Sequence, residues 1–243
     1  MITNLQKTFS RLVLHYLPHS IGFLSVVGFA SCTASLSGLS PETLSKRGLK
    51  PGEGLIVGRY ESVCIDRSRH GSPSLVMDSF LRASATDRKD GTNIIINNGT
   101  SSGILDFIHV PQAQPDSCFA IPVPAGNYEI DGWLMTANGY GSTIVVRNRL
   151  PMKVPFQVRA GEATYLGKVG VVSINNKNFL GLPAFAEGVI LIADQFDKDS
   201  GEISTNFASI RRSQIHRSDV PQLYAKEMKR VADTPRHWWD GLL

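Results

Sequence analysis

The sequence lacks the features that mark several large protein classes. Its 243 residues include three cysteines, 8% aromatic residues and 19% charged residues, with 25 Lys and Arg against 21 Asp and Glu. A net charge of +4 is too small to indicate a nucleic-acid binder. The chain carries no phosphate-binding loop or dinucleotide fingerprint. After residue 32 no apolar run approaches the roughly 18 residues of a membrane span, so we expect a soluble domain.

Patterns that bind metals are also missing. The four histidines beyond residue 32 lie far apart and show neither His-x-x-x-His nor Cys-His spacing, so we expect no zinc site. They are His70, His109, His216 and His237.

A cluster of carboxylates has two interpretations. Hard cations such as Ca²⁺ prefer several carboxylate oxygens, so a calcium loop is one of them. EF-hand spacing fails, however, because counting Asp197 as position 1 puts Gly201 at position 5, where a ligand belongs. We therefore expect residues 197–202 to form a solvated polar loop, and we expect no metal or other cofactor. The carboxylates are Asp194, Asp197, Asp199 and Glu202.

The N-terminal segment has the pattern of an export signal. Lys7 and Arg11 make it positive, it contains no Asp or Glu, and residues 21–30 are apolar and uncharged. Ten residues suit a signal peptide and are short for a membrane span of about 20 residues. The run ends in Ala30 and Ser31, followed at once by a cysteine.

This junction, with Cys32 after two small residues, resembles the lipobox of bacterial lipoproteins. The resemblance implies that residues 1–31 are removed and that the thiol of Cys32 carries a lipid. Because Thr33 follows, with no Asp to mark inner-membrane retention, it also implies an outer-membrane protein facing the periplasm. A plain signal cleaved after Ala30 or Ala34 and an uncleaved anchor remain the alternatives.

Removing this segment leaves Cys64 and Cys118, an even pair in an oxidising compartment. Both fall in predicted strands, so a disulfide between them is one expectation, and it would stabilise by about 3–4 kcal/mol. Two buried free thiols, which pack as small hydrophobes, are the alternative.

The remaining chain divides into three parts. Residues 32–53 are rich in Ser, Gly and Pro and are expected to form a flexible tether, with one helical turn capped by Ser40. Residues 54–215 alternate short apolar strands with turn signals every 8–15 residues or so, which predicts a β-sandwich. Residues 216–243 hold a helix and an apolar tail. The predicted strands are 55–65, 74–82, 93–97, 104–110, 118–123, 127–135, 142–147, 152–159, 164–174 and 188–193.

The C-terminal helix is predicted over 219–232 from an apolar stripe with helical spacing. We expect the stripe to pack on the sandwich, with a partner-binding helix as the alternative. Trp238 and Trp239 in the tail, and the basic pair Arg211 and Arg212, are the candidate interaction residues. The stripe consists of Val220, Leu223, Tyr224, Met228 and Val231.

Two short motifs carry a second resemblance. The run from Pro124 through Gly126 to Tyr128, and the later turn at Gly161 followed by Tyr165, are similar to the pattern of transthyretin-like or carboxypeptidase-regulatory-like β-sandwiches. The resemblance implies a mainly β, Ig-like or transthyretin-like antiparallel β-sandwich with a C-terminal helix. It transfers no catalytic residue, because these are fold motifs.

One string matches an enzyme motif. Residues 99–103 fit G-x-S-x-G, the nucleophile elbow, with Ser101 as nucleophile, but the elbow needs a following helix and residues 104–110 have a strand pattern. We therefore expect no enzyme. The expected function is a lipid-anchored structural or protein-interaction module of the cell envelope, with a protein partner and no nucleic acid. A ligand-binding sandwich is second and a hydrolase using Ser101 third.

Overall fold

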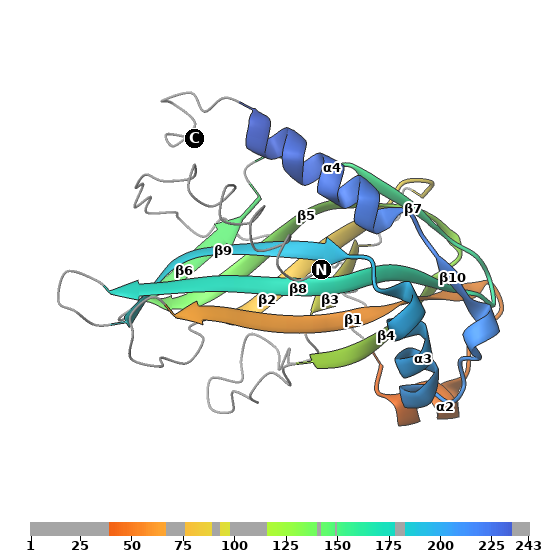
Figure 1. Ribbon diagram of the computed structural model, residues 1–243. Helices are drawn as coiled ribbons and strands as arrows, with labels where there is room; N and C mark the ends of the chain where they lie inside the picture. Colours follow the sequence, from red (N-terminus) through yellow and green to blue (C-terminus); the bar gives the residue numbers. More distant parts are fainter. Residues whose placement is uncertain are drawn as a thin grey trace. The chain divides into compact units, whose positions relative to one another are not determined.

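The computed structural model describes residues 39–66, 76–88, 93–97, 116–139, 142–148, 150–177 and 183–234. By its contacts the chain divides into two units, Thr33–Glu227 and Met1–Cys32 with Met228–Leu243. The first unit holds all the strands (Figure 1). The described part of the second is the end of one helix, in which Lys229 and Asp233 form an ion pair. Among the described residues, no helix is both long enough and apolar enough to cross a membrane.

The described residues are mainly β, with ten strands in two five-stranded sheets. One sheet is mixed: β4 (Asp116–Pro124) pairs antiparallel with β1 (Glu53–Asp66), and β1 pairs parallel with β8 (Ala163–Lys177). β9 (Pro183–Ala193) and β10 (Ile215–Arg217) both pair with β8, antiparallel and parallel respectively. The predicted all-antiparallel pairing is therefore wrong for this sheet.

The other sheet is antiparallel throughout. Its centre is β5 (Gly126–Gly139), which pairs with β2 (Val76–Ala85), β6 (Ser142–Arg147) and β7 (Val154–Val158), and β3 (Asn93–Asn97) pairs with β2. The two sheets contact each other through buried side chains. The Tyr60 hydroxyl of β1 lies 2.6 Å from the Ser79 hydroxyl of β2, and both residues are buried.

The predicted strands that fall on described residues are present. The turns at Gly126 and Gly161 are present too. Gly161 adopts a positive φ of 75° in the turn between β7 and β8. Tyr128 is buried and donates a 2.6 Å hydrogen bond to the Pro124 carbonyl, so it fills the core as the motif predicted. The predicted strand 104–110 lies outside the described residues.

The sequence of residues 127–135 predicts one buried face through Tyr128, Ile130, Gly132 and Leu134, and this alternation fails part-way along β5. Tyr128 and Ile130 are buried as expected, but the pairing with β2 skips Asp131, which forms a bulge. An extra residue reverses the side-chain parity, so Trp133 and Met135 are buried instead of continuing the series through Leu134.

Three helices and a short 3-10 helix complete the described fold. They are α2 (Pro41–Arg47), α3 (Phe196–Asn206), α4 (Val220–Asp233) and η1 (Arg212–Gln214). The predicted helix over 219–232 is confirmed as α4. Within the first unit, the buried Tyr224 of α4 donates a 2.9 Å hydrogen bond to the Ile190 carbonyl of β9.

Residues 39–53 correct the prediction of a flexible tether through residue 53. Ser40 caps α2 and Pro41 begins it, as expected. Leu44, however, is 2% exposed and belongs to a hydrophobic cluster with Val57 and Tyr165. The backbone amide of Leu39 also donates to the Ala120 carbonyl of β4 at 3.1 Å. Burial of a leucine side chain contributes about 1.5–3 kcal/mol, which holds this stretch on the sheet.

Candidate functional site

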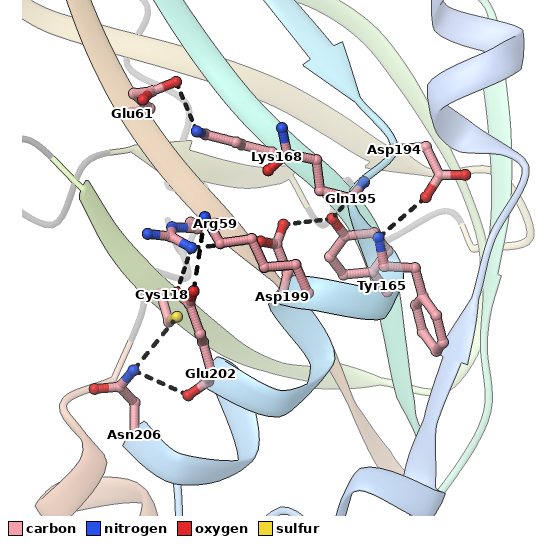
Figure 2. Close-up of polar contacts among 12 residues, drawn as sticks. Arg59, Glu61, Cys118, Tyr165, Lys168, Asp194, Gln195, Asp199, Glu202 and Asn206 are labelled. Carbon is pink, nitrogen blue, oxygen red and sulfur yellow. Dashed lines mark hydrogen bonds and ion pairs between the residues drawn. The ribbon is translucent and has the colours of Figure 1, made fainter. Parts of the chain in front are cut away.

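The expected polar loop at 197–202 is wrong, because these residues form the first half of α3. Their polarity does not mean exposure: Asp199 and Ser200 are both fully buried. α3 packs against β1, β4 and β8, and its polar groups find partners on those strands. The result is a polar cluster centred on the buried Asp199 (Figure 2).

Asp199 is at the centre of this cluster. Its Oδ2 atom accepts a 2.6 Å hydrogen bond from the Tyr165 hydroxyl of β8, and its Oδ1 atom lies 3.5 Å from Nη1 of Arg59 on β1. The Tyr165 hydroxyl also accepts from the backbone amide of Gln195 at 3.3 Å. Burial, reinforced by the hydrogen bond to Asp199, raises the pKa of Tyr165 far above its ordinary value. The phenol therefore remains protonated at neutral pH.

Arg59 links this centre to a second acid and a thiol. The same Nη1 atom pairs with Glu202, one turn further along α3. Nδ2 of Asn206 lies 3.6 Å from Sγ of Cys118 on β4 and donates a 2.9 Å hydrogen bond to the Glu202 carbonyl. Burial raises the pKa of the Cys118 thiol, with Arg59 acting in the opposite direction. Because the thiolate is the reactive form, the raised pKa argues against a nucleophilic cysteine here.

Further ion pairs surround this cluster. Lys168 of β8 pairs with Glu61 of β1 at 2.8 Å. Arg217 of β10 donates two hydrogen bonds to Oδ2 of Asp194, at 3.0 and 2.6 Å. Three of the four carboxylates in the predicted calcium-loop alternative, Asp194, Asp199 and Glu202, thus face cations. Among the described residues no group of three or more His, Cys, Asp or Glu side chains is arranged to hold a metal ion.

The geometry of the cluster suits a structural clamp. Each of its charged groups faces an opposite charge, and removing one partner of a buried pair typically costs about 3–5 kcal/mol. The carboxylate of Asp199 is 0% exposed, so no substrate reaches it without movement of α3. The ion pairs of the cluster therefore fix α3 to the mixed sheet.

A groove opens beside this cluster, between α2 and the segment before β10. It has a volume of about 220 Å³ and a mostly apolar lining. Its lining is formed by Leu44, Gly48, Leu49, Leu55, Gly161, Glu162, Ala163, Ser209, Ile210 and Gln214.

The structure separates the residues predicted for interaction. Arg212 is engaged with α3: its Nε donates to the Ser200 hydroxyl at 3.2 Å and its Nη2 to the Asp197 carbonyl at 3.3 Å. Arg211 is exposed beside the groove. Trp238 and Trp239 lie outside the described residues, as do Cys32 and Ser101.

The expected disulfide is absent from the structure, where Cys118 is a free thiol. The strand register explains why. Cys118 pairs with Arg59 of β1, and Cys64 lies five residues further along the same strand. At about 3.3 Å per residue the two Cα atoms are roughly 16 Å apart, whereas a disulfide needs less than about 7 Å.

Sequence reasoning missed Arg59, and it named Tyr165 and Asp199 for other reasons without predicting that they meet. One signal was available: Arg59 is a charged residue inside the apolar run that becomes β1, and a charge in such a run needs a partner. The identity of that partner, 140 positions away, had no local signal.

Comparison with known proteins identifies no family. No family model matches the chain, and no relative is found among curated proteins. A solved structure with some similarity is a leucine-rich repeat protein from Bacteroides thetaiotaomicron VPI-5482, at 8% sequence identity and a TM-score of 0.27. The similarity covers 49% of this chain, which spans 14% of the length of that protein. A likeness of this size carries no argument about fold or function.

Proposed function

We propose that this chain is a lipid-anchored protein of the bacterial cell envelope, and that its β domain is a structural or protein-interaction module. The observation that carries the proposal is the N-terminal sequence. A positive segment is followed by ten apolar residues that end in Ala30, and Ser31 and Cys32 come next. The described part of the domain begins at Leu39. We place the protein at the outer membrane, facing the periplasm.

We further propose that the two sheets form a transthyretin-like or Ig-like sandwich. The contact between Tyr60 and Ser79 supports face-to-face packing of the sheets. The buried Tyr128 and the positive φ of Gly161 support the two motifs on which the resemblance rests. The parallel pairing of β1 with β8 departs from the antiparallel pattern of that family.

The absence of catalysis is part of the proposal. It is supported by the chemistry of the polar cluster, in which Asp199 is buried and paired and the pKa of Cys118 is raised. Ser101 remains the third candidate, as the nucleophile of a hydrolase.

The anchor is tested by fractionating cells that express the full chain, its Cys32→Ala variant and, as a matched control, Cys118→Ala. We expect wild type and Cys118→Ala to stay with the membranes and to incorporate labelled palmitate. Cys32→Ala is expected to lose the label and the membrane association. Cross-linking pull-downs from the same membranes then identify the protein partner. If wild type and Cys32→Ala both fractionate with the soluble periplasm, the proposal is wrong.

A ligand-binding domain is the second candidate, and the groove beside α2 is the observation in its favour. Its volume of about 220 Å³ falls below the roughly 300–1,000 Å³ of typical small-molecule sites. The size therefore favours an anchoring side chain of a partner over a whole ligand.

A further inference from the structure

Three segments far apart in sequence meet at the groove. The Gly161 amide donates to the Glu53 carbonyl at 2.8 Å, and the Glu53 amide donates to the Lys50 carbonyl at 3.0 Å. Residues 209–214 line the same groove from the other side. The end of α2, the turn between β7 and β8, and the segment before β10 thus form one surface of the domain.

This surface carries four exposed cations, which we name the basic end. Each lies within two positions of a groove-lining residue, namely Gly48, Leu49, Gly161 or Ile210. The basic end consists of Lys46, Lys50, Arg159 and Arg211.

Two of the three acids near this surface are already matched, and the third, Glu42, lies one turn before Lys46 on α2. Glu53 pairs with Arg47 at 2.7 Å, and Glu162 lies between Arg159 at 3.7 Å and His216 at 3.4 Å. Among the described residues no carboxylate forms an ion pair with Lys46, Lys50 or Arg211. The acids therefore leave an excess of positive charge that faces solvent.

The covalent chain limits how far this surface can lie from a lipid on Cys32. Leu39 lies seven positions after Cys32, and a fully extended chain spans at most about 3.6 Å per position, or roughly 25 Å in all. Leu39 is fixed to β4 by its backbone hydrogen bond and leads directly into α2. This step rests on the proposed lipid anchor, which would bring the α2 side of the domain close to the bilayer.

We propose that the basic end is a membrane-facing surface that binds anionic phospholipid headgroups. Lys46 lies two residues after the buried Leu44, so it occupies the opposite, outward face of α2. Ammonium and guanidinium groups bind phosphate well. Each Lys or Arg near an anionic surface contributes about fivefold in affinity, and the effect falls off within a Debye length.

The test uses the full-length Cys32→Ala chain and vesicles of 30% phosphatidylglycerol in phosphatidylethanolamine, or of phosphatidylcholine alone. Lys50→Gln with Arg211→Gln is compared with Lys177→Gln, a matched control. Lys177 is exposed at the far end of β8, about 46 Å along the strand from Ala163 of the groove. Bound fractions are measured by sedimentation in 50 and 500 mM NaCl.

We expect stronger binding to the phosphatidylglycerol vesicles, a loss of about 25-fold in the double variant, and no loss in the Lys177→Gln control. Lys50→Arg with Arg211→Lys should retain the affinity, because the charge is kept. Equal binding to both vesicle types, or a double variant within twofold of the control, overturns the proposal and reassigns the surface to an acidic protein. Failure of the lipid anchor would appear separately, in the fractionation experiment.

Discussion

The strands of the two sheets differ in how their residues are buried. In the mixed sheet, residues 54–60 of β1 and the first five residues of β8 are buried without interruption. In the antiparallel sheet, β7 alternates strictly between buried and exposed positions. Continuous burial needs cover on both faces, and alternation means that one face meets water. The comparison shows that α2 and α3 turn part of one sheet into an interior layer.

The covered layer also differs in how it treats charge. Beneath α3, the side chains of Arg59 and Asp199 form an ion pair that is almost completely buried. The packing of α3 on the sheet depends on this pair. On the antiparallel sheet the corresponding pair, Arg82 and Asp131, lies at the surface. Because water screens exposed pairs and penalises unpaired buried ones, the same chemistry should carry very different energies in the two places.

The largest expected effect comes from breaking the buried pair. Asp199→Ala removes the buried one of the two acids that Arg59 faces and leaves the Tyr165 hydroxyl without its acceptor. We expect the unfolding free energy to fall by about 3–5 kcal/mol. Urea denaturation measures the loss. The double variant Arg59→Met with Asp199→Leu should recover most of it, since no buried charge is then left unpaired and Glu202, which loses Arg59, is 38% exposed to water. A loss below about 1 kcal/mol for Asp199→Ala would contradict the clamp.

A smaller effect is expected at alkaline pH. Burial raises the pKa of Tyr165 and Tyr224 far above about 10, so both stay protonated in the fold while the unfolded chain releases those protons. The folded state then binds more protons, and stability declines as pH rises above about 10. Each tyrosine contributes up to about 1.4 kcal/mol per pH unit to this slope.

Tyr224→Phe is expected to remove one such contribution, which denaturation at pH 9, 10 and 11 will show. An unchanged slope in Tyr224→Phe would mean that this hydroxyl reaches solvent. The stability of Tyr224→Phe at pH 7 measures the loss of the hydrogen bond to Ile190 alone, because tyrosine does not titrate there. The additional change between pH 9 and pH 11 then measures the titration.

The smallest effect is expected on the antiparallel sheet. Nε of Arg82 donates to Asp131 at 2.6 Å, but the Arg82 side chain is 59% exposed. Arg82→Gln should therefore change stability by less than about 1 kcal/mol, and 0.5 M salt should reduce the difference further. A cost similar to that of Asp199→Ala would remove the distinction between the two sheets.

Local patterns predicted α4, the capped turn of α2 and every described strand except the short β10, because each depends on neighbours in sequence. α3 escaped prediction because Asp, Ser and Gly favour turns, and only a partner on β1 makes Asp199 a buried helical residue. The bulge at Asp131 reversed a correct alternation for a similar reason, since it is visible only in the pairing with β2.

The site residues were predictable only where their role depends on local sequence and not on distant partners. Arg211 was recognisable as an exposed cation, whereas the bridge between Cys64 and Cys118 depended on a strand register that spacing does not determine. The groove is built from α2, β1, β8 and residues 209–214, so it exists only after long-range packing.

The parallel pairing of β1 with β8 has a consequence for the order of folding. Leu55 pairs with Ala163, about 110 residues later, so the pair cannot close until most of the chain is available. During synthesis from the N-terminal end, β1 can pair with β4 once that strand is made, but its other edge stays open until β8 is available. An open edge on an apolar strand is prone to aggregate, so we expect this edge to need protection until β8 arrives.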